Sequence, residues 1–216
     1  MIRSFGLIDV LYLVAAARWT LLLTLVAFLG ASLVGLSIAL LRVAPLAPLR
    51  WLASLYIQIV QGTPLLVWLF LLYFGLSIAG LEINSWVAAG NAFAIFGGAF
   101  LGEIWRGALV SISKTQWEAG ASLGLSSIEQ LRHVIIPQSI RVAIPPTVGF
   151  LVQLIKNTSL AATIGLVELT REGQLTSAAT FRPFAVYLTV AALYFAMCFP
   201  LTQWSRSLER RFNVAR

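Results

Sequence analysis

Long apolar runs alternate with short polar segments along the whole chain. The clearest run, residues 19–41, contains 23 residues and no charged side chain. A helix needs about 20 apolar residues to cross the ~30 Å hydrocarbon core of a bilayer. Runs of similar character at 51–80, 86–110, 140–166 and 184–204 predict four further crossings. We therefore expect an all-α membrane protein with five transmembrane helices, in one domain over residues 1–216.

The segment before the first long run has two interpretations. Arg3, an apolar stretch and the alanines at 15–17 have the outline of a cleavable signal peptide. Asp9 interrupts that apolar stretch. We therefore favour a short amphipathic helix that lies at the membrane interface.

The second run is too long for a straight crossing and contains the helix-breaking sequence Gln61-Gly62-Thr63-Pro64. Pro64 has no N–H and restricts Thr63, so the helix should kink here and free a carbonyl one turn back. Broken helices at membrane depth persist where they face protein or a water-filled cavity. Gly62 and Pro64 mark either a break that faces substrate or a purely structural kink, and both interpretations stay open.

Residues 112–137, between the third and fourth runs, are too polar to cross the membrane. Their apolar residues recur at three- or four-residue spacing, as in amphipathic helix, and the pattern is interrupted around Gly124, where a tight turn is easy. We expect two short helices joined at this glycine. Glu118 places a charge at one end, and the small residues Ala119, Gly120 and Ala121 would let a soluble partner approach closely.

The distribution of charge predicts which side of the membrane each loop faces. The chain has 15 Lys and Arg against eight Asp and Glu, a net charge of +7. Ten of the 15 lie in segments 42–50, 106–141 and 206–216, all on one side of the predicted spans. Positively charged loops stay in the cytoplasm, so we expect an outside N-terminus and a cytoplasmic C-terminus. Because the charges fall between apolar spans, we expect no nucleic-acid partner.

Composition argues against several other functions. Cys198 is the only cysteine, so no disulfide within the chain and no thiol metal cluster can form. His133 is the only histidine and has no neighbouring cysteine or paired carboxylates at metal spacing. Neither lysine follows a glycine, as a phosphate-binding P-loop requires, and no nucleophile elbow occurs. An autonomous secondary transporter or channel is the main alternative, but the second half contains no duplicate of the break at 61–64.

The polar segment resembles the EAA motif of binding-protein-dependent ABC importers, in which Glu-Ala-Ala, a glycine and then Leu-Pro recur at set spacings. Here Glu118-Ala119-Gly120 precedes Gly124, six residues after the glutamate, and Pro137 lies thirteen residues after that glycine. Gly120 and Ile136 depart from the pattern. Blocks that begin at Gln61, Gly102 and Lys156 are similar to permeases for polar amino acids of the histidine, glutamine and arginine type. The resemblance extends over about residues 19–206.

The resemblance implies the type I ABC importer permease fold in a bacterial cytoplasmic (inner) membrane. The polar segment would be the coupling helix that docks into an ATP-binding cassette ATPase subunit, through Glu118, Ala119, Gly120, Gly124 and Pro137. ATP and Mg would bind to that ATPase, and this chain would hold no cofactor. Further implied partners are a second permease chain, identical or related, a periplasmic or lipid-anchored solute-binding protein, membrane lipid and the amino acid itself.

Polar side chains inside the spans are costly and are therefore candidates for the substrate pathway. An amino-acid zwitterion needs donors and acceptors, and those near the second and fourth spans are Gln61, Thr63, Gln153, Lys156, Asn157 and Ser159. We expect them to converge near the bilayer midplane. Alternatively, Gln153 joins helices by hydrogen bonding and Lys156 pairs with Glu168 or Glu172. Glu103 and Arg106, three apart on one helix, are better interpreted as an ion pair than as substrate contacts.

Overall fold

The structure is a computed structural model that describes residues 4–213, and every regular element in that range is helical. The α-helices are α1 Leu7–Val43, α2 Ala47–Gln61, α3 Leu65–Phe70, α4 Leu76–Ile78, α5 Ser85–Val110, α6 Lys114–Ser122, α7 Ser127–Gln130, α8 Ile136–Asn157, α9 Leu169–Thr180 and α10 Pro183–Asn213. The π-helical turns η1 Leu71–Gly75 and η2 Leu131–Ile135 join α3 to α4 and α7 to α8, and a 3-10 helix, η3 Thr158–Ile164, continues α8. Arg3 and Arg216, which enter the charge count, lie outside the described residues.

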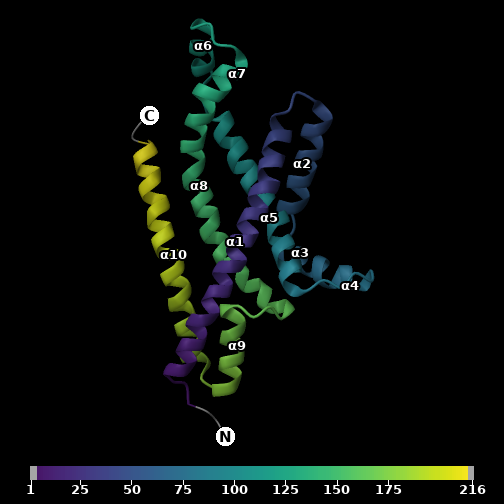
Figure 1. Cartoon of the computed structure of the whole chain (residues 1–216), viewed down its shortest axis with the longest axis vertical. Coiled ribbons are helices and arrows are strands. Elements are labelled where there is room, and N and C mark those ends of the chain that lie inside the picture. The colour runs from purple at the N-terminus through teal and green to yellow at the C-terminus, as the bar shows by residue number, and fades with distance from the viewer. Residues whose placement is uncertain (1–3, 214–216) are drawn as a thin grey trace.

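Within residues 4–213, four helical stretches are long and apolar enough to cross a membrane: Leu7–Val43, Ser85–Val110, Ser127–Ile164 and Pro183–Phe212. A fifth crossing is available if α2 and the stretch Leu65–Ile78, which meet at an angle of 98°, act as one broken span. The all-α membrane fold is therefore confirmed, and the third predicted run matches α5 to within one residue. In Figure 1, α1 begins at the end of the molecule opposite to the end where α10 stops.

The separate amphipathic helix expected before the first span is not present in the described residues. Helix α1 runs unbroken from Leu7 to Val43 and is 37 residues long, about 55 Å. Asp9 does not interrupt it, because its carboxylate accepts the backbone N–H of Gly6 at 2.9 Å and so caps the first turn. An acidic residue in the first turn also interacts favourably with the helix dipole.

Helices α1 and α5 pack together along a seam of small residues. A Cβ added at Gly98 of α5 would lie 2.4 Å from Cγ1 of Val34, and one at Gly102 would lie 2.9 Å from Cγ2 of Ile38. On α1, a Cβ at Gly35 would lie 2.9 Å from the Cβ of Leu101. Small residues let transmembrane helices approach closely, where packing supplies most of the attraction. This pair forms the centre of the molecule, and α8 and α2 pack on α5 from either side (Figure 1).

The fourth helical stretch begins earlier than the sequence predicted, at Ser127 instead of residue 140. Pro137 has no N–H with which to continue the regular helical pattern. The helix accommodates it by widening into the π turn η2, in which the N–H of Ile136 donates to the carbonyl of Leu131. Helix α9 lies after this stretch and was not predicted.

Candidate functional site

The connection between α5 and α8 projects from one end of the helical bundle as the α6–α7 turn, residues 113–130 (Figure 1). Helix α6 begins after Ser113, whose hydroxyl accepts the backbone N–H of Thr115 at 3.2 Å. A serine in this place satisfies one of the N–H groups that a helix start leaves unpaired. Helix α6 is therefore capped at its first turn.

Gly124 ends α6 with a φ of +76°. Its N–H donates to the carbonyl of Ala121 at 2.9 Å, and the N–H of Leu125 donates to the carbonyl of Gly120 at 3.1 Å. These two bonds form a Schellman motif, which favours glycine at the left-handed position. The join at Gly124 is confirmed, but the second helix is not a separate short one, because α7 continues through η2 into α8.

Gly120, which departs from the Glu-Ala-Ala pattern, lies beneath the side chain of Gln130. A Cβ added at Gly120 would lie 2.9 Å from Cγ of Gln130. Gln130 is buried, and its amide donates to the carbonyl of Leu125 at 2.8 Å, across the turn. The absence of a side chain at Gly120 thus lets Gln130 hold α6 and α7 together.

Two further contacts make the turn rigid. Ser126 donates its N–H and its hydroxyl to the carboxylate of Glu129 at 2.8 and 2.7 Å, and the N–H of Glu129 donates back to the hydroxyl at 3.4 Å. This capping box begins α7, and the hydrogen bonds from Ser126 hold the pKa of Glu129 below its ordinary value of 4.5. Gln138 of α8 donates to the side-chain oxygen of Gln116 in α6 at 3.3 Å.

The outer surface of the turn combines small, apolar and acidic residues. Leu123 is 80% exposed and Ile128 is 77% exposed. Glu118 and Ala119 are also exposed. Within residues 4–213 the ion pairs join only Glu103 to arginines, so the carboxylate of Glu118 has no cation partner there. A rigid projection with an unpaired charge and exposed apolar side chains is suited to docking another protein.

The break predicted in the second span is present between α2 and α3. Pro64 cannot donate to the carbonyl of Val60, and the hydroxyl of Thr63 donates to it instead at 3.3 Å, as well as to the carbonyl of Ile59 at 2.9 Å. The indole N–H of Trp68 donates to the same hydroxyl at 2.6 Å. A Cβ at Gly62 would lie 2.7 Å from the carbonyl oxygen of Gln58, so the break needs a glycine there.

The other predicted substrate residues do not form one enclosed site in the single chain. The amide of Gln61 donates to the carbonyl of Ala99 in α5 at 3.3 Å, whereas Gln153 and Lys156 of α8 have exposed side chains. The hydroxyl of Ser159 donates back to the carbonyl of Lys156 at 2.7 Å, and Asn157 is half-buried. Helices α2 and α8 both pack on α5, and α3 packs against η3, which brings the break close to the turn that contains Ser159.

The ion pair predicted between Glu103 and Arg106 is confirmed. The Nε of Arg106 donates to both carboxylate oxygens of Glu103, at 2.9 and 3.0 Å. Arg42 of α1 approaches the same carboxylate at 3.8 Å. The three side chains therefore connect α1 with α5 near the end that bears the α6–α7 turn.

Residues 31–214 match the family of binding-protein-dependent transport system inner membrane components. The chain belongs to this family. The permease is 39% identical over 201 residues to the probable amino-acid ABC transporter permease protein YckA of Bacillus subtilis (strain 168), across 93% of this chain and 89% of that one. It is 36% identical over 204 residues to the glutamine transport system permease protein GlnP of Escherichia coli (strain K12), across 94% and 93% of the two chains.

A solved structure agrees with the sequence relatives. The permease superposes with a TM-score of 0.89 and 32% identity on a chain in the crystal structure of an amino acid ABC transporter with histidines, over 97% of the permease and 100% of that chain. The permease is therefore a membrane subunit of a transport system and not an enzyme.

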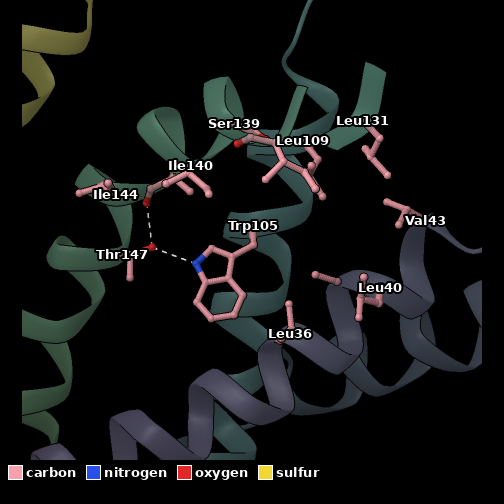
Figure 2. A pocket seen from close by; sticks show the side chains of 13 residues that line it. Leu36, Leu40, Val43, Trp105, Leu109, Leu131, Ser139, Ile140, Ile144 and Thr147 are labelled. Atoms are coloured by element: carbon pink, nitrogen blue, oxygen red, sulfur yellow. Dashed lines mark hydrogen bonds between the residues drawn. The ribbon is translucent and has the colours of Figure 1, made fainter. Parts of the chain in front are cut away.

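An apolar pocket of about 510 Å³ lies between α1, α5 and α8 of the permease. Figure 2 shows the indole of Trp105 inside it, with its N–H directed at the hydroxyl of Thr147, 3.0 Å away. The other polar side chain, Ser139, donates to the carbonyl of Ile135 at 2.7 Å. A zwitterion in this pocket would leave its charges unpaired, which is costly, so the pocket is not suited to the substrate.

Sequence reasoning did not recognise the role of Glu168 in the permease. Its carboxylate is fully buried and accepts the hydroxyls of Thr20 at 3.3 Å and Tyr194 at 2.9 Å, and the N–H of Arg171 at 2.9 Å. It thus ties α1, α9 and α10 together, and burial raises its pKa above the ordinary value of 4.5. Among the described residues it forms no ion pair with Lys156, contrary to one alternative considered for that lysine. Glu168 is the N-cap residue of α9, and this position could have drawn attention to it only if α9 had been predicted.

Proposed function

We propose that the permease moves a polar amino acid inward across the bacterial inner membrane, driven by a separate ATP-binding cassette ATPase that docks on the α6–α7 turn. The observation that supports this most directly is the exposed, rigid turn at motif spacing, with Glu118 unpaired within the described chain and Gly124 setting its shape. Ala119, Gly120 and Pro137 complete the coupling element. The amino-acid relatives support the class of substrate.

The substrate pathway is formed by more than one chain in this proposal. Gln153 and Lys156 are exposed in the single chain, and a buried zwitterion needs paired donors and acceptors. A second permease chain, identical or related, would cover these side chains and bring Asn157, Ser159 and the break at Gln61 and Thr63 into one route.

The remaining parts of the system follow from the same proposal. ATP and Mg bind to the ATPase, and this chain, one permease domain over residues 1–216, holds no cofactor. The N-terminus lies outside and the C-terminus lies in the cytoplasm. A solute-binding protein, periplasmic or lipid-anchored, delivers the amino acid to the outer side.

The test is a coupled assay of the permease assembled with its ATPase in liposomes. Glu118→Lys places a cation where the docking surface has a carboxylate, so we expect ATP hydrolysis to lose its dependence on substrate and uptake to be lost. Glu82→Lys, which changes another exposed glutamate by the same charge, is the matched control and should transport normally. Normal coupled uptake by the Glu118→Lys transporter would overturn the docking assignment.

A further inference from the structure

A second hollow, of about 690 Å³, lies where α5 and α10 end and α8 begins. It is lined by segments that are distant in the sequence. Gln116 of α6, Gln138 and Arg141 of α8 and Arg211 of α10 contribute polar groups, and Val142 and Phe212 contribute apolar surface. The hollow is on a different face of α8 from the pocket around Trp105. Residues 138, 141 and 142, which are three or four apart and share one face of the helix, line the hollow. Residues 136, 139 and 140 share another face and line the pocket.

Both arginines of this hollow are uncompensated in the described chain. Arg141 and Arg211 are exposed, and no acidic side chain lines the hollow within residues 4–213. The ion pairs in that range belong to Arg42 and Arg106, so neither lining guanidinium has a carboxylate partner there. Two cations that line one hollow repel each other unless an anion lies between them.

The hollow lies at the level where lipid headgroups are expected. Arg141 is at the start of the apolar run 140–166, and Trp204, which is 53% exposed, ends the run 184–204. Arg211 follows seven residues later, about 10 Å along the helix. The headgroup layer is about 5–7 Å thick on each side of the hydrocarbon core, and an arginine side chain can reach back toward it.

We propose that this hollow binds the headgroup of an anionic phospholipid, whose phosphodiester accepts hydrogen bonds from Arg141 and Arg211. The planar guanidinium matches the geometry of phosphate oxygens, and basic pockets between transmembrane helices suit such headgroups. The bilayer supplies this ligand at the depth of the hollow. Val142, which lies in the apolar run 140–166, offers the apolar surface that an acyl chain needs and a free phosphate does not.

The test measures bound lipid on the assembled transporter. Transporter reconstituted in phosphatidylcholine with phosphatidylglycerol is extracted, and retained phosphatidylglycerol is counted by native mass spectrometry. The Arg141→Gln, Arg211→Gln double variant should bind it roughly tenfold more weakly or worse, because charge-assisted hydrogen bonds are lost. The control, Arg132→Gln with Arg210→Gln, removes the same charge from exposed arginines that do not line the hollow and should retain the lipid.

Three results would overturn the proposal. Equal loss in both double variants would indicate general attraction of a basic surface, and displacement by inorganic phosphate alone would indicate a free-anion site. Loss of the ATPase from the Arg141, Arg211 variant with lipid retained would make the hollow part of the protein interface. If that variant does not assemble, photoactivatable phosphatidylglycerol on the unaltered transporter decides: labelling at Val142 or Phe212 supports the proposal, and labelling only elsewhere contradicts it.

Discussion

Glycines determine how closely the central helices approach. Gly98 and Gly102 of α5 face Val34 and Ile38 of α1 at distances that no Cβ tolerates, whereas Gly107 of the same helix has no neighbouring atom within 4 Å of such a Cβ. The packed glycines, Gly98 and Gly102, and the unpacked glycine, Gly107, lie on the same helix. They therefore separate the effect of packing from the general preference of helices for alanine.

Gly98→Ala should destabilise the permease by about 1–3 kcal/mol, because overpacking displaces Val34 or the helix backbone. Gly107→Ala is the matched control and should leave stability unchanged or raise it by about 0.5–1 kcal/mol, through helix propensity alone. Thermal unfolding of the assembled transporter measures both. Adding Val34→Ala to the Gly98 variant should restore part of the loss. Equal shifts for the two glycines would show that α1 and α5 do not pack as described.

Gln153→Ala and Lys156→Ala should weaken stimulation by substrate far more than assembly or basal ATP hydrolysis. Removing a hydrogen-bonding partner of a buried group costs ~1–3 kcal/mol, roughly ten- to hundredfold in affinity. Substrate titrations of ATP turnover in liposomes measure the effect. Poor assembly with unchanged apparent affinity would instead make these residues contacts between helices.

Secondary-structure elements of the permease are interrupted where function is proposed. The shape of the α6–α7 turn depends on the left-handed Gly124, the capping box that begins at Ser126, and the side chain of Gln130 packed over Gly120. The π turn before Pro137 joins this turn to α8. Each device satisfies backbone groups that an interruption would leave unpaired. The element is thereby held in one shape although it projects from the bundle.

The order of the α6–α7 turn should depend on pH through Glu129. Its pKa is below 4.5 in the folded turn, so the capping box contributes fully above pH 4.5 and is lost as the pH falls through the lower folded value. Hydrogen exchange of residues 126–130, corrected for intrinsic rates, should therefore accelerate in acid. Glu129→Gln cannot titrate and should abolish this dependence. The same acceleration in that variant would assign it to another group.

At the scale of the whole molecule, the distribution of basic residues predicts the direction of insertion. The basic segments 42–50 and 106–141, and the described part of the C-terminal segment, residues 206–213, lie on the side that bears the α6–α7 turn, as the path of the helices in Figure 1 indicates. From the positive-inside rule we expect this side to be cytoplasmic.

A reporter that is active only in the cytoplasm should work when fused after Arg216 and fail when fused before Met1. The charge asymmetry gives the reason, since basic loops resist translocation. Fusion within the residues 112–113, ahead of α6, should also give cytoplasmic activity. Activity only at the N-terminal fusion would mean that the topology is inverted.

Much of this fold was predictable because a lipid bilayer constrains each segment separately: a span must be apolar, long enough to cross, and internally hydrogen-bonded. The third apolar run, the break at Pro64 and the join at Gly124 depend on residues close together in the sequence, and the structure places each where the sequence predicts it. The beginning of α1 differs from the prediction, because Asp9 caps the helix instead of interrupting it. The start of the fourth stretch was also placed too late, since polar residues continue a helix that leaves the membrane.

The sequence by itself determined that the chain is a helical membrane permease and where its α6–α7 turn lies, since hydropathy, proline and glycine act through the backbone whatever surrounds them. Only the tertiary structure decided which side chains meet. Gly98 packs against Val34, and Gln130 covers Gly120. The carboxylate of Glu168 accepts hydrogen bonds from Thr20 and Tyr194. Arg141 and Arg211 line one hollow. These contacts join distant segments, and their partners follow from helix rotation and packing, which no local pattern specifies.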